Sequence, residues 1–171
     1  MKTSDVTDIV GALNSSGAQY LVVGGLAVVA HGYVRFTQDI DIVLKLEKAN
    51  VLLAMDALTA IGYRPLIPVN ARNFADAAMR QLWIEEKHMI VFQMLHPDRP
   101  STRLDIFVEE PFVFADEYSR ARWETIFDEK VPIVHLDQLL ILKRAAGRPN
   151  DLADIAELEH ISNHLKSSHG K

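Results

Sequence analysis

The sequence predicts an α+β fold of two layers, in which a mixed β-sheet is flanked by helices and a helical pair ends the chain. Two observations support this class. Helical patterns alternate with short apolar runs in the first half of the chain, and later runs of strand length pair around turn-forming residues. The 171 residues suit one domain over 1–171, with a core over about 18–110 and a hairpin and helices over about 111–166.

The first half of the chain alternates helix and strand signals. Apolar residues recur at helical spacing over 6–13 and predict a first helix. The run YLVV at 20–23 is short and is followed by two glycines, which predicts a buried strand. The run LAVVAH at 26–31 is apolar on all sides and predicts a short buried helix. The run DIDIVLKL at 39–46 predicts a second strand.

The middle of the chain predicts two more helices around an irregular segment. An amphipathic pattern over 47–61 predicts a long helix that Gly62 follows. Prolines interrupt the extended segment 63–69, so this segment is expected at a sheet edge or in a loop. Asn70 is a favourable capping residue and predicts a helix over 71–82.

The remaining elements are two hairpins and three helices. The strands predicted at 89–96 and 103–108 are joined by the turn PDRPST, and a second hairpin over 124–134 turns at Asp128–Glu129. Between these hairpins, a short helix is predicted over the segment ADEYSRA at 115–121. The chain ends with helices predicted over 136–146 and 151–165, which the segment GRPN separates.

The composition restricts the classes of partner and compartment. The chain has no cysteine, which excludes disulfides and thiolate metal sites and favours a reducing compartment. No apolar run approaches membrane-spanning length, and the N-terminus lacks the apolar core of a signal peptide, so a cytoplasmic protein without membrane partners is expected. The net charge of −5 gives no general basic footprint for nucleic acid, although a local basic patch or bound metal ions can still recruit phosphate.

Asp39 and Asp41 stand in what otherwise reads as a buried strand. Residues i and i+2 of a strand point to the same face, so the two carboxylates project together while Ile40 and Ile42 project into the opposite apolar layer. Neighbouring carboxylates repel each other and are costly to bury unpaired. Paired carboxylates on one rigid face are therefore suitable ligands for a hard divalent ion such as Mg²⁺.

A D-x-D pattern alone leaves several interpretations open. Asp is common where a strand leaves a polar turn, so an exposed strand start is one interpretation. Sugar-nucleotide transferases and aspartyl-phosphate hydrolases also carry D-x-D, but in the hydrolases the pair follows an apolar strand, whereas here it opens one.

Two further features favour a phosphate-handling site. Gly24 and Gly25 follow the first strand and open a helix, where glycine permits close approach of a ligand and free amides attract phosphate. Asp105 lies between Leu104 and Ile106 in the middle of another predicted strand. If that strand lies beside the first two, Asp105 completes a site of three carboxylates.

The chain resembles the nucleotidyltransferase superfamily typified by DNA polymerase β in one sequence pattern. The pattern consists of Gly24 and Gly25, a spacer of thirteen residues, the D-I-D motif of Asp39 and Asp41, and a later Asp105 on a strand. Two motifs are similar to those of small bacterial nucleotidyltransferases that include the abortive-infection toxin family. They are GG-x-A-x-x-A-H-G-x-x-R-x-T-x-D-I-D and LLILKRAAGRPNDLADIAEL. The resemblance covers roughly 20–160. Many members of the superfamily have serine where Gly25 stands.

The resemblance implies a nucleotidyltransferase fold in which Asp39, Asp41 and Asp105 are catalytic and hold two Mg²⁺ ions, with Mn²⁺ as a substitute. It implies transfer of a nucleoside monophosphate from a nucleoside triphosphate, such as ATP, to a hydroxyl on RNA or tRNA, a protein or a small molecule. It also implies a role as the toxin of a toxin–antitoxin or phage-defence system, with an antitoxin partner. The alternative is a non-catalytic module on the same fold that binds a nucleotide or a partner.

Five more residues are candidates for nucleotide binding. Arg35 and Thr37 immediately precede the two aspartates and are placed either to contact the triphosphate or to fix the turn. Lys143 stands at the end of an apolar helical stripe, from which it can reach a triphosphate or a carboxylate, or cover apolar surface with its stem. Asp154 either favours the dipole from the first turn of its helix or faces inward and pairs with Lys143 or Arg148. Arg148 either binds phosphate or caps the preceding helix.

Overall fold

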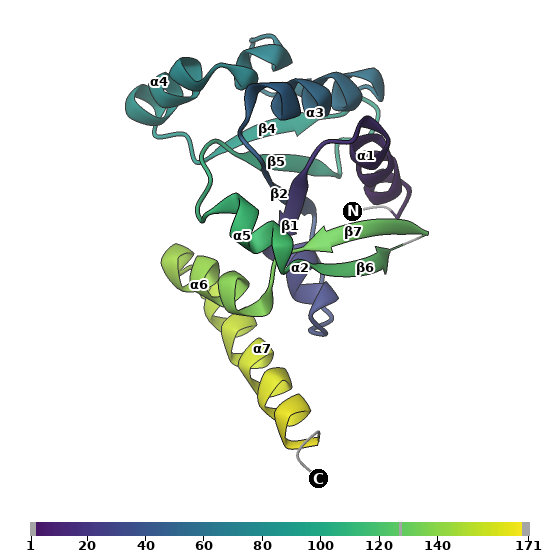
Figure 1. Ribbon diagram of the computed structural model, residues 1–171, viewed down its shortest axis with the longest axis vertical. Helices are drawn as coiled ribbons and strands as arrows, with labels where there is room; N and C mark the ends of the chain where they lie inside the picture. The colour runs from purple at the N-terminus through teal and green to yellow at the C-terminus, as the bar shows by residue number, and fades with distance from the viewer. Residues whose placement is uncertain (1–2, 127, 169–171) are drawn as a thin grey trace.

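The computed structural model describes residues 3–126 and 128–168, and Figure 1 shows a central sheet with helices around it and a C-terminal helix that extends away from it. The strands are β1 (Tyr20–Val23), β2 (Asp39–Leu44), β3 (Arg64–Pro65), β4 (Val91–Leu95), β5 (Arg103–Phe107), β6 (Arg122–Ile126) and β7 (Glu129–Ile133). The helices are α1 (Thr3–Ser16), α2 (Gly24–Ala30), α3 (Lys48–Ala60), α4 (Ala77–Lys87), α5 (Phe114–Ser119), α6 (Leu136–Ala146) and α7 (Pro149–Ser168), with a 3₁₀ turn, η1, at Ala71–Ala75.

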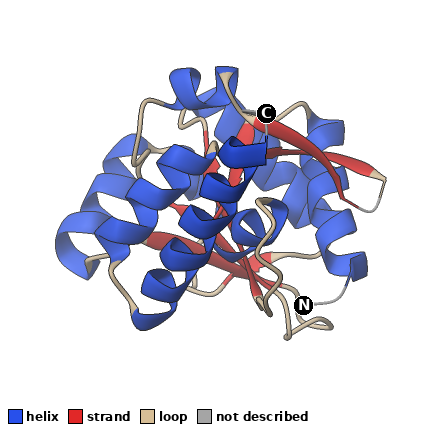
Figure 2. Cartoon of the chain, turned by 90° about the horizontal axis from the view of Figure 1, so that it is seen from below, coloured by secondary structure: helices blue, strands red, loops and turns tan. Residues whose placement is uncertain are grey.

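The strands form one mixed sheet in the order β3-β4-β5-β2-β1-β7-β6. The central pair β1 and β2 is antiparallel, whereas β2 runs parallel to β5 and β1 runs parallel to β7. The two predicted hairpins, β4–β5 and β6–β7, are antiparallel and are confirmed. The mixed α+β class predicted from the sequence is therefore confirmed, as Figure 2 also shows.

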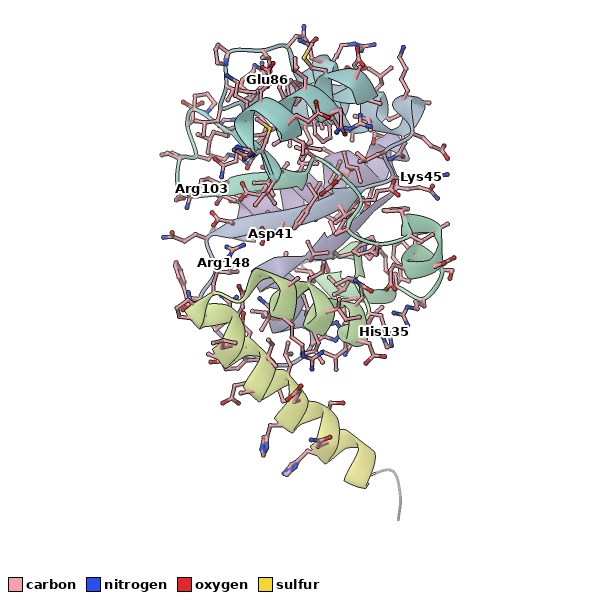
Figure 3. The ribbon with its side chains drawn as sticks, turned by 90° about the vertical axis from the view of Figure 1, so that its left-hand side faces the viewer. Asp41, Lys45, Glu86, Arg103, His135 and Arg148 are labelled. Carbon is pink, nitrogen blue, oxygen red and sulfur yellow. The ribbon has the colours of Figure 1, made fainter. Side chains whose placement is uncertain are left out.

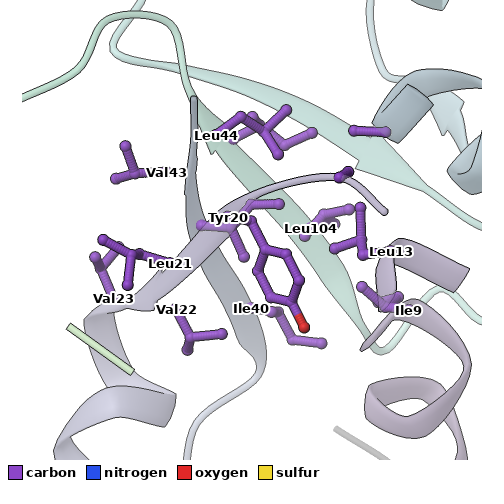
Figure 4. Packing of buried hydrophobic residues seen from close by; sticks show 14 of the residues in the cluster. Ile9, Leu13, Tyr20, Leu21, Val22, Val23, Ile40, Val43, Leu44 and Leu104 are labelled. Carbon is purple, nitrogen blue, oxygen red and sulfur yellow. The ribbon is translucent and has the colours of Figure 1, made fainter. Parts of the chain in front are cut away.

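Part of the hydrophobic core lies on the face of the sheet opposite the aspartates. Ile40 of β2 and Leu104 of β5 have no exposed surface, and Figure 4 shows them beside Ile9 and Leu13 of α1. Asp39 and Asp41 thus share one face of β2 while Ile40 and Ile42 are buried on the other. Val43, farther along the face of the aspartates, is buried as well. None of the described helices is both long enough and apolar enough to cross a membrane.

The prediction of a single helix over 71–82 is wrong, because the structure has two separate elements there. Asn70 does cap its first turn by accepting from the Arg72 amide, but that turn is the short 3₁₀ segment η1. Asp76 then adopts extended backbone angles and accepts from the amides of Ala78 and Met79, which begins α4 anew. A second capping side chain inside the predicted span thus competes with helix continuation.

Candidate functional site

The three predicted carboxylates lie on one face of two neighbouring strands. In the parallel pair β2–β5, Asp41 is directly opposite Asp105, and Asp39 is opposite Arg103. All three carboxylates are half-buried. Figure 3 shows Arg103 and Arg148 on either side of Asp41. The structure therefore brings together Asp39, Asp41 and Asp105.

The glycine pair lies directly against Asp41. Gly24 has a φ of +61°, and a Cβ atom there would overlap Oδ2 of Asp41. The Gly25 amide donates a hydrogen bond to the Asp41 carboxylate, and a Cβ at Gly25 would lie 2.5 Å from Oγ1 of Thr37. The two glycines thus let the backbone approach the carboxylate and the threonine more closely than any other residue allows.

Replacing Gly24 with Ala is expected to destabilise the protein by clearly more than replacing Gly17 with Ala. Both residues have positive φ, so each alanine costs about 1–2 kcal/mol of backbone strain. Only Gly24 has a neighbour in the way, since a Cβ at Gly17 meets nothing within 4 Å. Thermal unfolding of both variants measures the difference. Equal losses of stability would show that Asp41 moves aside at no cost.

Burial and mutual repulsion make this face electrostatically costly. The pKa of Asp105 is raised to about 6, mainly by burial and also by the charge of Asp41, while a hydrogen bond from Gln93 opposes the rise. Burial also raises the pKa of Asp41, against the hydrogen bond from Gly25. Among the described residues, Oδ1 of Asp105 is buried without a hydrogen-bond partner. An ionised carboxylate with an unsatisfied buried oxygen favours a cation as its partner.

The third carboxylate, Asp39, is held by an arginine. The Nε atom of Arg103 lies 2.9 Å from Oδ1 of Asp39 across the β2–β5 pair. Within the part of the chain that the structure describes, no three His, Cys, Asp or Glu side chains form a group that could hold a metal ion as they stand. The carboxylate chemistry and the unpartnered Asp105 oxygen fit a hard divalent ion.

A buried ion network joins the loop before β2 to the last two helices. Asp154 of α7, 1% exposed, lies 2.7 Å from Nζ of Lys143 of α6 and 2.6 Å from Nε of Arg35 in the loop. Asp154 faces inward, and Lys143 is one of its two partners. The other partner is Arg35 and not Arg148.

The network continues to the turn between α6 and α7. Asp151 lies 3.0 Å from Nζ of Lys143 and accepts from the backbone amide of Arg148 at 3.2 Å. The Arg148 side chain is mostly exposed, with its Nε 3.5 Å from Asp151. The network holds three cationic and two anionic groups, and the charges of Lys143 and Arg148 both lower the pKa of Asp41. This excess of one positive charge therefore lies close to the carboxylate face.

The sequence reasoning missed two members of the site. Gln93 of β4 is opposite Asp105 and donates to its Oδ2 at 3.4 Å, which depends on a hairpin register that the sequence left open. Asp151, which lies 3.0 Å from Nζ of Lys143, is the second. Four other arginines are engaged away from the carboxylates: Arg64 with backbone carbonyls, Arg72 with Asp56, Arg80 with the Phe74 carbonyl, and Arg99 with Asp8.

Comparison with known proteins gives structural matches only. No protein-family model matches the sequence, and no curated protein matches it significantly. The lincomycin-bound lincosamide antibiotic adenylyltransferase LnuA matches with a TM-score of 0.62 and 18% identity, over 94% of this chain and 98% of LnuA. ANT(2'')-Ia matches in its structure with adenylyl-2''-tobramycin (TM-score 0.56, 12% identity, 98% of each chain) and in its solution structure (0.57, 14%, 98% and 92%). The chain therefore has the fold of LnuA and ANT(2'')-Ia.

Proposed function

We propose that the chain is a nucleotidyltransferase that moves a nucleoside monophosphate from a nucleoside triphosphate to a hydroxyl acceptor. The observation that carries this proposal is the register that sets Asp41 opposite Asp105, with Asp39 on the same face and Gly24 against Asp41. This arrangement stands in a fold shared with LnuA, which is named as an adenylyltransferase, and with ANT(2'')-Ia, whose structure holds an adenylylated tobramycin. ATP is therefore the first donor to test.

Asp39, Asp41 and Asp105 would hold Mg²⁺, or Mn²⁺ in its place. When bound, such ions neutralise the charge that develops on the phosphoryl and leaving oxygens. The fit rests on the all-carboxylate donor set and on the unpartnered Oδ1 of Asp105. Residues of the chain do the remaining work of orienting the groups and moving the proton.

The proposed reaction is an in-line displacement at the α-phosphorus. The acceptor oxygen forms a bond to the α-phosphorus while the bond from that phosphorus to the bridging oxygen of the β-phosphate breaks, and pyrophosphate leaves. The hydroxyl proton passes to the carboxylate of Asp105, which acts as the general base. The glycine pair and the cations Arg35, Lys143 and Arg148 are proposed to bind the triphosphate, and Thr37 and Asp154 to hold this surface in place.

The acceptor is proposed to be a small molecule with a free hydroxyl. Support comes from the names of the two structural neighbours, which act on or hold antibiotics, and from the similar length of the chains. An RNA, tRNA or protein acceptor, the role as a toxin and the antitoxin partner stay predictions of the sequence resemblance. They enter the experiment below as separate arms.

Incubating the chain with Mg²⁺ and triphosphates labelled at the α-phosphate tests the proposal. Separate reactions contain aminoglycosides, lincosamides, bulk tRNA or a protein extract, and we expect label in a small-molecule product together with release of pyrophosphate. The matched control is Asp39→Asn, which is expected to transfer no label. Triphosphate binding by calorimetry without Mg²⁺ dependence and without pyrophosphate release would instead identify the non-catalytic module.

A further inference from the structure

Arg103 is the cation that now contacts the carboxylate face. It is the register neighbour of Asp39 in the β2–β5 pair, and its Nε lies 2.9 Å from Oδ1 of Asp39. The side chains are 46% and 34% exposed, so the ion pair is open to water and to exchange. An exposed pair of this kind contributes little to stability. The contact can therefore break without unfolding the sheet.

Arg103 also lies beside Asp105 on the same strand. The two residues are separated by one position on β5 and so project from the same face of the strand. The charge of Arg103 lowers the pKa of Asp105, in line with this closeness. The guanidinium of Arg103 therefore interacts electrostatically with two of the three carboxylates. It lies on the side of Asp39 that faces β5.

We propose that Arg103 and a divalent cation compete for Asp39, and that binding of the ion releases Arg103 to bind a phosphate group of the donor. This inference rests on the proposed function for the identity of the donor, but its first step concerns the chain and the metal alone. A guanidinium suits both partners, because it pairs with carboxylate and with phosphate through the same fork of N–H groups. Loading of the site and recruitment of the donor are thereby coupled through one side chain.

Titration of the full chain with Mn²⁺ in the absence of nucleotide tests the first step, with free Mn²⁺ followed by electron paramagnetic resonance. Arg103→Gln removes the charge and keeps a side chain of similar shape, and is expected to bind Mn²⁺ about threefold to tenfold more tightly than the wild type. Arg103→Lys keeps the charge and is expected to stay within about twofold of the wild type. The matched control is Arg144→Gln, which removes an exposed arginine of α6 that pairs with Glu159 and is expected to leave Mn²⁺ binding unchanged.

Binding of a non-hydrolysable triphosphate analogue tests the second step. At saturating Mn²⁺, Arg103→Gln is expected to bind the analogue about tenfold more weakly, so that the two affinities move in opposite directions. A merely structural role would weaken both. Unchanged or weaker Mn²⁺ binding by Arg103→Gln, or no Mn²⁺ binding by the wild type, would overturn the inference. Failure of the proposed function is a separate result, namely opposite shifts in both affinities with no transfer of label.

Discussion

Replacing Asp105 with Asn is expected to lower nucleotidyl transfer by about a thousandfold or more while leaving the fold intact. The variant removes one metal ligand and the proposed proton acceptor, and each of these contributes several kcal/mol to the transition state. A loss of about 4 kcal/mol corresponds to about a thousandfold in rate. Asn is close in shape to Asp and can still accept from Gln93, so the β4–β5 pairing is expected to persist. Label transfer under the conditions above measures the loss.

The same substitution is expected to raise the free energy of unfolding at pH 8 by about 1 kcal/mol. The folded-state pKa of Asp105, about 6, lies above its ordinary value of 3.8, so the folded protein binds the proton more tightly than the unfolded chain does. Ionisation of Asp105 therefore destabilises the folded protein as pH rises through about 6. Asn stays neutral and avoids this cost, which partial exposure keeps small, and a gain of this size raises the melting temperature by about 2–4 °C.

The advantage of the Asn variant is expected to shrink as pH falls through about 6 and to vanish below about 3.8, where Asp105 is protonated in both states. Thermal unfolding at pH 8 and at pH 4.5 measures this trend. The matched control is Asp98→Asn, an exposed residue of the β4–β5 turn, which should change neither stability nor transfer. Transfer within tenfold of the wild type, or lower stability of Asp105→Asn at pH 8, would contradict the role of Asp105.

The local part of this site could be predicted from the sequence because it depends on strand periodicity. Asp39 and Asp41 share a face in any strand, so their opposition to Ile40 and Ile42 follows without knowledge of neighbouring strands. The pairing of Asp41 with Asp105 joins residues far apart in the chain. From the sequence it could be predicted only on the condition that the strand of Asp105 lies beside the first two strands. A register shift of one residue would have turned Asp105 into the core and Leu104 onto the carboxylate face.

For the charged residues of the last two helices, the sequence could predict an inward orientation but not which residue each one contacts. Helical spacing placed Lys143 and Asp154 on inward faces, and both are buried. Which cation reaches Asp154 depends on how the loop before β2 passes α7, and that loop has no periodic pattern to indicate its path. The approach of Arg35 to Asp154 therefore needed the structure. The division of the 71–82 helix at Asp76 has a similar origin, because a capping side chain there decides locally against the longer pattern.

Replacing Lys143 with Met is expected to lower the free energy of unfolding by about 3–5 kcal/mol. Met fills most of the volume of the lysine stem but leaves Asp154, 1% exposed, with Arg35 as its one cation, and takes the buried charge away from Asp151. Removing one partner of a buried pair costs more than the pair itself contributes, because the remaining charge has no water to solvate it. Chemical denaturation of wild type and variant measures the loss.

Arg144→Gln is the matched control, since Arg144 and Glu159 join the same two helices at 2.5 Å but are 53% and 47% exposed. Water screens that pair, so the control is expected to lose less than about 1 kcal/mol. The two substitutions both remove a cation between α6 and α7, and they differ in burial. A loss of the same size in both variants would show that Lys143 acts through helix contacts alone.

The double variant Lys143→Met with Asp154→Leu separates the burial of charge from the loss of packing. It removes the buried carboxylate that Lys143→Met leaves with Arg35 as its one cation, and Arg35, which is 25% exposed, can turn toward water. The double variant is therefore expected to be more stable than Lys143→Met, with a coupling free energy of about 1–3 kcal/mol. Both variants are expected to have low transfer activity, because the charge of Lys143, one of the two that lower the pKa of Asp41, is missing in each. Stability that returns without activity would show that this network serves the carboxylate face as well as the fold.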